Sequence, residues 1–458
     1  MKETQKVIEL LRNFESRNVM FFEPDGSWPI VWERAKDVFV WDADGKKYLD
    51  LTAAFGVAAA GHANPNVVKA GQKQMARLLH AMGDVHPHAL KARLAQKLSG
   101  LTFERWADES KVQSSKSRID GAQTGSVTKT INSKSKTGKV IFCNSGFEAV
   151  EAALKTAALA TKKTGIIAFS GAYHGLGYGT LNVTHRKFFR SPFLPQLREF
   201  GHFAAFPKRH SDLAAVEFQI RHFFRRERIG AILAEPVQAR GGINVPPPEF
   251  LALLRKLADE FGALLILDEI YTGFGRTGKW FACEHSGVIP DLICLGKALT
   301  GGFPLSACVG HAELMDAAWP ASTGEAIHTS TFLGHPVGCA MAMAQISEIE
   351  NLNLCQQSAE LGKFLLDELA KLQSLKFKIE VRGLGLMAGL ELKLPDGKPA
   401  TDIVLASIKT LLHRGYIFLP EGEHGNVISF TPPLTITQTQ LAKAVTELNG
   451  VLTTDGHG

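Results

Sequence analysis

The chain has 458 residues, of which 45% are hydrophobic and 21% are charged. This length supplies about three domain-equivalents of ~150 residues, and the hydrophobic share excludes a mostly disordered chain. The balance of 51 Lys and Arg against 45 Asp and Glu gives a net charge of only +6. Proteins that bind nucleic acids are usually more basic and carry clustered charge, so the composition disfavours a nucleic-acid partner.

The cysteines and the apolar runs indicate an intracellular chain. None of the six cysteines forms a CxxC pair, so we expect reduced, mostly buried thiols and no metal site. The first 18 residues lack the apolar core of a signal peptide. No apolar run approaches the ~20 residues that a membrane helix needs. We therefore expect a cytoplasmic protein without a membrane segment.

Hydrophobic periodicity predicts an α/β fold. Residues 1–20 have apolar side chains at helical spacing, and Asp44-Gly45 separates two alternating runs, which predicts a hairpin over 38–51. Short apolar strands then alternate with helical patterns, and several are apolar throughout, as parallel strands covered by helices are. The expected strands are 139–143, 165–169, 230–234, 263–268 and 291–295.

This pattern suggests a large domain with a mainly parallel, mixed sheet and a smaller α+β domain. We expect residues 1–60 to contribute a helix and a hairpin to the small domain, residues 61–325 to form the large domain, and residues 326–458 to complete the small one. Residues 108–138 are rich in Ser, Thr and Lys and poor in apolar residues. They are expected to form a flexible surface insertion, with a partner-binding or regulatory loop as the alternative.

Two motifs at predicted strand ends suggest contacts with a phosphorylated, planar ligand. In the segment 142–155, a strand runs into Asn144-Ser145-Gly146 and then into a strong helix pattern. The N–H groups at a helix N-terminus bind anions, although a simple Ser-capped helix would look the same. In the segment 169–179, Tyr173 and His174 lie between glycines, where an aromatic ring could stack on a ligand or belong to an ordinary loop.

Two further strand ends carry charged side chains. Asp268 and Glu269 end an apolar strand, and strand alternation points them to opposite faces. A buried carboxylate such as Asp268 needs a cationic or hydrogen-bonding partner, which a protonated heteroaromatic nitrogen would supply. Lys297 follows another apolar strand beside Gly296. A partly buried lysine with a lowered pKa is the usual Schiff-base nucleophile, although a surface lysine at a strand end has the same local sequence.

Residues 273–278 match the GxGxxG pattern of dinucleotide-binding folds. That pattern requires a turn that opens a helix, followed about 20 residues later by an acidic residue. Here no clean helix start follows the glycines, so we expect no nicotinamide cofactor.

Taken together, the strand-end motifs describe a site for pyridoxal 5′-phosphate. Ligands of parallel α/β sheets bind at the carboxyl ends of the strands, where these motifs meet. The set contains an anchor for the phosphate, an aromatic ring to stack on the pyridine, a carboxylate for the ring nitrogen, and a lysine for the aldehyde.

The sequence resembles the class III aminotransferases, the ω-, ornithine- and 4-aminobutyrate-type enzymes of PLP fold type I. Matching stretches occur in family order over nearly the whole chain. They are WDADGKKYLDL, GHANP, NSGFEAVEAALK, AYHG, EPVQARGG, LDEIYTGFGRTG, LGKALTGGFPL, STFLGHP and VRGLGLMAGLEL.

This resemblance implies roles for individual residues. Lys297 corresponds to the Schiff-base lysine and Asp268 to the partner of the pyridine nitrogen. The residues expected to contact the cofactor are Ser145, Gly146, Phe147, Tyr173, His174, Ile270, Tyr271 and Thr331, with Tyr173 and Ile270 on opposite ring faces. Thr331 corresponds to a residue that reaches the phosphate in the neighbouring subunit, which implies a homodimer with shared active sites, or a tetramer built from such dimers. Arg382 matches an arginine that clamps a substrate carboxylate.

Four positions depart from the family pattern. Phe147 replaces a Thr or Ser whose hydroxyl binds phosphate, and Tyr271 stands where Gln is frequent. His335 replaces an Asn, with no consequence that we can derive. Arg240 replaces the Glu that neutralises the carboxylate-binding arginine in 4-aminobutyrate and ornithine enzymes, which disfavours a simple assignment to either. Arg240 is thus a second candidate for binding an anionic substrate group, or it pairs with a surface acid.

The resemblance implies an aminotransferase that moves an amino group from a primary amine or ω-amino acid to pyruvate or 2-oxoglutarate by a ping-pong mechanism. The nearest alternative is an amino-acid racemase or aminomutase of the same fold and cofactor. A nicotinamide oxidoreductase and a non-catalytic binding protein are more remote.

Overall fold

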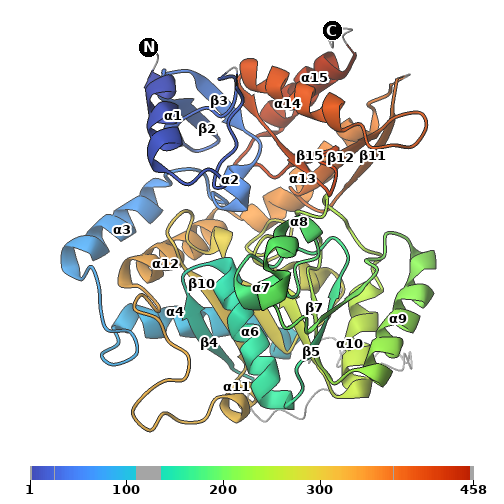
Figure 1. The fold of residues 1–458 in the computed structure, drawn as a ribbon. Helices are drawn as coiled ribbons and strands as arrows, with labels where there is room; N and C mark the ends of the chain where they lie inside the picture. Colours follow the sequence, from blue (N-terminus) through green and yellow to red (C-terminus); the bar gives the residue numbers. More distant parts are fainter. Residues whose placement is uncertain (1–2, 25, 110–135, 375, 454–458) are drawn as a thin grey trace, which may run out of the picture.

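A computed structural model describes residues 3–24, 26–109, 136–374 and 376–453, and its centre is a seven-stranded sheet (Figure 1). The strand order is β4-β10-β9-β8-β7-β5-β6. Strands β5, β6, β7, β8 and β9 all run parallel to one another, whereas β10 is antiparallel to both β9 and β4. The strands are β4 (Gly138–Cys143), β5 (Gly165–Phe169), β6 (Gly201–Ala204), β7 (Ile229–Ala234), β8 (Leu264–Asp268), β9 (Leu292–Leu295) and β10 (Ser306–His311). The expected mixed, mainly parallel sheet is confirmed.

Helices cover both faces of this sheet, which explains why its inner strands are apolar throughout. On β8, Leu265 and Leu267 belong to one buried cluster, and Leu264 and Ile266 belong to another. The first cluster includes side chains of α4 (Ala89–Ser99) and α10 (Phe250–Phe261), and the second includes those of α6 (Gly146–Thr161). Because successive side chains point to opposite faces, a strand covered on both sides needs apolar residues at every position.

Two smaller four-stranded sheets complete the fold. One contains β1 (Trp32–Lys36), β2 (Phe39–Asp42), β3 (Lys47–Asp50) and β13 (Tyr416–Ile417), and the other β11 (Lys378–Gly383), β12 (Ala388–Lys393), β14 (Leu419–Glu421) and β15 (Val427–Phe430). The antiparallel pair β2–β3 confirms the predicted hairpin, and Gly45 in its turn has a φ of +85°. Strand β3 pairs with β13, so the N- and C-terminal parts lie side by side (Figure 1). Residues near both ends of the chain therefore contribute strands to the same sheet.

The remaining elements are mostly connecting helices. The helices are α1 (Glu3–Phe14), α2 (Ala53–Gly56), α3 (Pro65–Arg77), α7 (Tyr178–Leu181), α8 (Lys187–Arg190), α9 (Leu213–Arg226), α11 (Ala312–Ala318), α12 (Pro336–Asn351), α13 (Leu354–Ala370), α14 (Thr401–His413) and α15 (Gln438–Thr453). The short helical turns are η1 (Gly100–Glu104), η2 (Ser191–Gln196), η3 (His210–Asp212), η4 (Ala282–His285) and η5 (Lys297–Leu299). Helix α1 confirms the helix expected within residues 1–20 and ends at Phe14.

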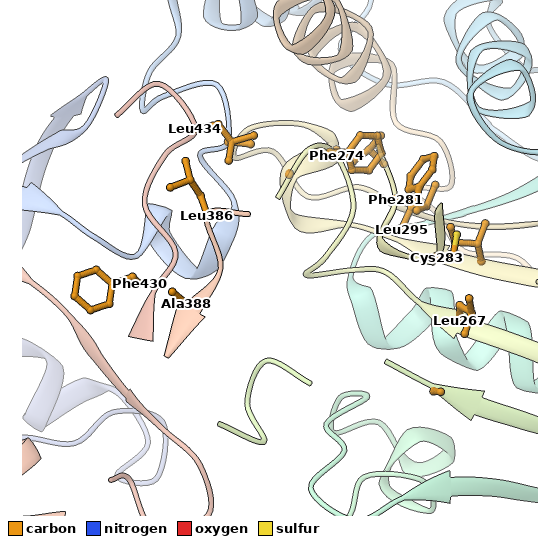
Figure 2. Close-up of a cluster of buried hydrophobic side chains, with 14 of the residues drawn as sticks. Leu267, Phe274, Phe281, Cys283, Leu295, Leu386, Ala388, Phe430 and Leu434 are labelled. Atoms are coloured by element: carbon orange, nitrogen blue, oxygen red, sulfur yellow. The ribbon is translucent and has the colours of Figure 1, made fainter. Parts of the chain in front are cut away.

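One hydrophobic core runs from the large sheet into the C-terminal part. Figure 2 shows Leu386, Ala388 and Phe430 of the C-terminal part in the same buried cluster as Leu267 and Phe281 of the large sheet region. This continuity fixes the C-terminal sheet relative to the ends of the large-sheet strands.

The GxGxxG segment 273–278 also connects the large-sheet region to the C-terminal part. It consists of turns and opens no helix, so it lacks the geometry of a dinucleotide-binding loop. Its Arg276 is buried and donates hydrogen bonds to the carbonyl oxygens of Leu386 and Pro432. The segment therefore connects the two parts of the fold.

The expected insertion at 108–138 lies mostly outside the described residues, which resume at residue 136. Within the described ranges, no helix is long and apolar enough to cross a membrane. The same residues contain no group of three or more His, Cys, Asp or Glu side chains arranged to hold a metal ion.

Candidate active site

A cavity of about 390 Å³ lies where strands β4, β5, β7, β8 and β9 end. It brings together residues that are far apart in the sequence. Of the residues predicted for the site, it is lined by Gly146, Phe147, Tyr173, His174, Arg240, Asp268, Ile270, Tyr271 and Lys297. The carboxyl ends of the parallel strands therefore form one site, as the strand-end motifs predict.

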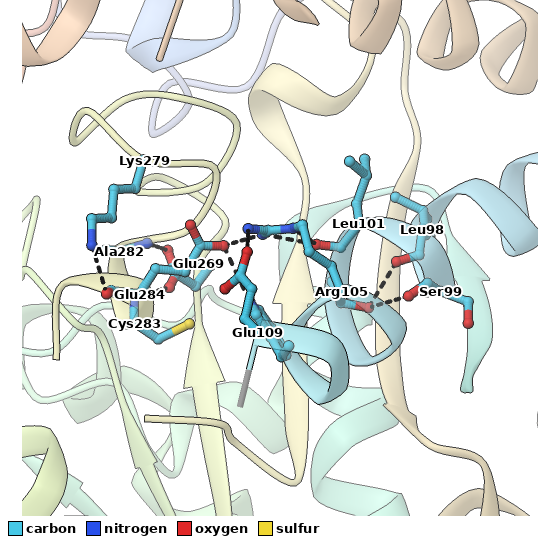
Figure 3. A network of polar contacts seen from close by, with 12 residues as sticks. Leu98, Ser99, Leu101, Arg105, Glu109, Glu269, Lys279, Ala282, Cys283 and Glu284 are labelled. Atoms are coloured by element: carbon cyan, nitrogen blue, oxygen red, sulfur yellow. Dashed lines mark hydrogen bonds and ion pairs between the residues drawn. The ribbon is translucent and has the colours of Figure 1, made fainter. Parts of the chain in front are cut away.

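The carboxylates of Asp268 and Glu269, at the end of β8, point in different directions. Asp268 faces the cavity, whereas Glu269 is buried in a polar network on the other side (Figure 3). The oxygens of Glu269 accept hydrogen bonds from the N–H groups of Ala282 and Cys283 at 2.9 and 2.8 Å, and from the Thr272 hydroxyl. Burial raises the pKa of Glu269 to about 7. Glu269 thus positions the loop after β8 and leaves Asp268 as the carboxylate of the site.

Asp268 is held in place from two sides. Its Oδ2 lies 2.7 Å from Nδ1 of His174, and its Oδ1 accepts a hydrogen bond from the N–H of Ile270 at 3.1 Å. Both Asp268 and His174 are buried and line the cavity. The Nε2 atom of His174 is buried and has no hydrogen-bond partner among the described residues. This arrangement fixes the orientation of a carboxylate that is directed at the cavity.

Lys297 follows β9 in a left-handed backbone conformation, with a φ of 38°. Its Nζ lies 4.3 Å from the centre of the Tyr271 ring, and the described residues give it no hydrogen bond. Burial lowers the pKa of Lys297, while the negative charges of Asp268, Glu235 and Glu421 oppose this shift. A lysine whose neutral form is favoured is suited to act as a nucleophile and as a base.

The start of α6 forms a second wall. Glu148 accepts hydrogen bonds from the N–H groups of Asn144 and Ser145. The hydroxyl oxygen of Ser145 is buried and has no hydrogen-bond partner among the described residues. At Gly146, an added Cβ would lie 2.9 Å from Cδ1 of Ile270, so only glycine fits there without displacing that side chain. Gly146 and Phe147, the first two residues of the helix, both line the cavity.

Aromatic and aliphatic side chains enclose the space between Lys297 and α6. Tyr173 lines the cavity with Phe189 against its ring, at a centroid separation of 5.7 Å. Ile270 lies on the side of Gly146. Tyr271 is buried, its hydroxyl lies 3.2 Å from the Thr431 hydroxyl, and burial raises its pKa to about 12. These residues give the cavity apolar walls suited to a flat ring.

Arg240 lies in the cavity and pairs with a buried acid. Its Nη1 is 3.5 Å from Oε1 of Glu421, at the end of β14. The expectation of a surface acid as the partner is wrong, because only 2% of the Glu421 side chain is exposed.

Three predicted residues do not line this cavity. Ser145 directly precedes Gly146 at the start of α6. Thr331 is exposed, and its neighbour Ser330 accepts a hydrogen bond from the Asn144 side chain at 3.3 Å. Arg382 is bonded to Glu391 and to the carbonyl of Gly242. The structure therefore does not bring Thr331 or Arg382 into the cavity of the same chain.

Sequence reasoning missed two buried carboxylates of the site. Glu235 lines the cavity and accepts hydrogen bonds from the N–H groups of Tyr173 and Ala239 at 3.0 and 3.2 Å. Burial raises the pKa of Glu235 to about 7. Glu235 directly follows β7, just as Asp268 ends β8, and this strand-end position is the sequence signal that could have identified it as a site residue. Glu421 had no such signal, because it reaches the site from a different sheet.

Comparisons with known proteins assign the family. The family model for class-III aminotransferases matches residues 22–452. The chain is 35% identical to acetylornithine aminotransferase from Methanosarcina acetivorans, over 92% of this chain and 91% of that protein. It is 36% identical to putrescine aminotransferase from Pectobacterium atrosepticum, over 92% and 82%.

A solved structure agrees with these sequence matches. An ornithine aminotransferase from Toxoplasma gondii, described with partial occupancy of PLP at its active site, superposes with a TM-score of 0.77 at 25% identity, covering 99% of this chain and 95% of that one. Family match, fold and site therefore agree. The chain belongs to the class III aminotransferases, a family of pyridoxal phosphate-dependent enzymes.

Proposed function

We propose that this aminotransferase moves an amino group from an ω-amino acid or another primary amine to a keto acid such as pyruvate or 2-oxoglutarate, in two half-reactions. The observation that carries this proposal is the single cavity in which Lys297, Asp268, Tyr173 and the start of α6 meet. These groups follow four different strands and are far apart in the sequence.

The side chains present fit pyridoxal 5′-phosphate. The hydroxyl of Ser145, to which the described part of the chain offers no hydrogen-bond partner, and the N–H groups of Gly146 and Phe147 would hold the phosphate. Tyr173 and Ile270 would enclose the ring, with His174 behind Asp268 and Tyr271 beside the amine of Lys297. The replacement of a hydroxyl by Phe147 leaves its backbone N–H for this purpose.

The cofactor, when bound, supplies an aldehyde that takes up amines and a cationic ring that accepts electrons from a breaking C–H bond. The Lys297 amine would provide the attachment point and, once free, remove the proton from the substrate carbon that bears nitrogen. Asp268, held by His174 and the N–H of Ile270, would keep a proton on the ring nitrogen. The apolar walls would exclude water while the lysine is free.

The substrate end remote from the reacting amine would face Arg240. The names of the relatives do not decide its charge, because acetylornithine carries a carboxylate and putrescine does not. An arginine in the cavity wall favours a donor with a distal carboxylate, since guanidinium and carboxylate form strong paired hydrogen bonds.

We further propose a homodimer in which Thr331 serves the site of the second copy. Thr331 lies on a surface formed by residues 78–85 and 327–332, where Asp84 accepts a hydrogen bond from Thr329 and the rings of His80 and Phe332 are 5.4 Å apart. This surface exposes the large apolar side chains Leu78, Leu79, Met82, Val85, Ile327 and Phe332. Exposed apolar patches of this kind are typical of protein interfaces.

A donor panel tests the proposed function. Diamines, ω-amino acids and hydrophobic amines are each incubated with the holoenzyme and either pyruvate or 2-oxoglutarate. We expect alanine or glutamate to form in proportion to the donor consumed, with ω-amino acids among the donors. Racemisation of an amino acid without a keto-acid-dependent product would instead assign a racemase and contradict the proposal.

A further inference from the structure

The guanidinium group of Arg382, on β11, donates hydrogen bonds both to residues 242–243 and to Glu391 on β12. Its Nε donates to the carbonyl oxygens of Gly242 and Ile243 at 3.1 and 3.0 Å, and its Nη2 donates to that of Gly242 at 2.6 Å. Its Nη1 lies 2.7 Å from Oε2 of Glu391, whose Oε1 accepts a hydrogen bond from the Asn426 side chain at 3.3 Å. A substrate carboxylate could reach this guanidinium only by breaking several of these bonds.

Arg240 is held much more loosely. The one ion pair of its side chain among the described residues is the 3.5 Å contact with Glu421, whereas charge-assisted bonds are usually 2.7–2.9 Å. The Arg240 side chain is 31% exposed and lines the cavity. Its guanidinium carbon is 5.8 Å from the centre of the Tyr173 ring, so it lies beside the residue that we expect to stack on the cofactor.

Glu421 is an incompletely bonded acid. Its Oε2 is buried without a hydrogen-bond partner in the described part of the chain. Burial raises the pKa of Glu421, although Arg240, Arg186 and Lys297 all oppose this shift. A buried carboxylate with one free oxygen is a weaker partner for Arg240 than a substrate carboxylate that offers two oxygens.

A second arginine, Arg186, lies beside Arg240 without lining the cavity itself. Arg186 donates a hydrogen bond from Nη2 to the carbonyl oxygen of Arg240 at 2.7 Å. Together, Arg186, Arg240 and Glu421 carry two positive charges and one negative charge. The nearby Glu423 is exposed, so solvent screens its charge. This cluster of three residues therefore favours an anionic group over a second ammonium group beside Arg240.

We infer that Glu421 is a specificity-determining residue that controls access to Arg240. With an uncharged distal group in the cavity, Glu421 keeps Arg240 paired. A substrate carboxylate displaces Glu421 and forms the ion pair with Arg240 in its place. This inference rests on the proposed function, and it assigns the contact to the distal carboxylate to Arg240 rather than to Arg382.

Two donors of equal length test this inference with the holoenzyme. 5-Aminovalerate and pentylamine differ in the distal carboxylate, and single-turnover measurements of the first half-reaction give the selectivity between them. Glu421→Gln is expected to raise the selectivity for 5-aminovalerate about tenfold, because Arg240 loses its internal anion. Arg240→Gln is expected to lower it by about tenfold or more, mainly by raising the apparent dissociation constant of 5-aminovalerate. Arg226→Gln, exposed at the end of α9, is the matched control and should leave it unchanged.

A binding measurement separates this inference from turnover. Glutarate, which has carboxylates and no amine, should raise the melting temperature of the wild type and of Glu421→Gln but not of Arg240→Gln. The inference is overturned if neither variant changes the selectivity, or if Arg382→Gln abolishes it while Arg240→Gln does not. Failure of the wild type to convert any donor of the panel would instead contradict the proposed function itself.

Discussion

At the scale of single residues, Asp268 is the group whose charge matters most in the proposed mechanism. Its two oxygens are bonded to His174 and to the N–H of Ile270, so Asn can keep both contacts in part while removing the charge. We expect Asp268→Asn to lower kcat by about 100-fold or more, because the charge is what keeps a proton on the ring nitrogen. Bound cofactor should remain visible in the absorbance spectrum. A kcat within about threefold of wild type would contradict this role.

Lys297 gives a prediction about pH and stability in the cofactor-free protein. Burial lowers its pKa below the 10.5 of a free lysine, against the attraction of Asp268, Glu235 and Glu421. Below the folded-state pKa, both states hold the proton and folding bears the full cost of the buried charge. As the pH rises through the folded-state pKa towards 10.5, the folded chain releases its proton first, so stability increases.

The variant Lys297→Met removes this cost. We therefore expect its cofactor-free form to melt at least about 2 °C above the wild type at neutral pH. The difference should shrink as the pH approaches 10.5. The measurement is thermal unfolding of both proteins from neutral pH towards 10.5. A difference in melting temperature that grows with pH would show that folding raises the pKa of Lys297 instead of lowering it.

Residues of the site could be predicted where local sequence fixes their position. Lys297 and Asp268 follow apolar strands, and parallel strands bring such ends together. The partner of Arg240 could not be predicted in this way, because Glu421 arrives from another sheet more than 150 positions later. The Gly242 carbonyl that binds Arg382 is likewise 140 positions away, and Glu391, although only nine positions away on the neighbouring strand β12, has no local pattern that marks it as the partner of Arg382.

At the scale of elements, the strands of the large sheet that could be predicted are those with a continuous apolar run. The expected strands at 139–143, 165–169, 230–234, 263–268 and 291–295 correspond to β4, β5, β7, β8 and β9. Strands β6 and β10 were not predicted. β6 is a short edge strand with His in its centre, and β10 contains Ser, Ala and Gly, so neither has a clear apolar run.

The start of α6 is the element whose geometry can be tested most directly. In Gly146→Ala, the new Cβ would meet Cδ1 of Ile270 at 2.9 Å and push that side chain into the space for the cofactor. We expect affinity for pyridoxal phosphate to fall about tenfold, as measured by titration of the cofactor-free protein. Gly100→Ala is the matched control, because nothing lies within 4 Å of its added Cβ. Equal loss in both variants would argue against a specific effect at α6.

At the scale of the whole molecule, the surface formed by residues 78–85 and 327–332 should join two copies. Phe332 is 54% exposed, and Phe332→Glu would place a charge in that interface. We expect light scattering to show dimers for the wild type and monomers for this variant, with activity lost in parallel because Thr331 no longer reaches a second site. Phe218→Glu on α9, where Phe218 is 69% exposed, should leave the dimer intact. An active monomeric wild type would refute the shared site.

In the proposed mechanism, Lys297 holds the cofactor in the cavity at the strand ends. Borohydride reduction of the holoenzyme fixes the bond between cofactor and lysine, and peptide mass mapping then locates the added group. We predict a single labelled peptide that carries the group on Lys297, and no label in Lys297→Met. A label on any other lysine of the wild-type holoenzyme would contradict the claim.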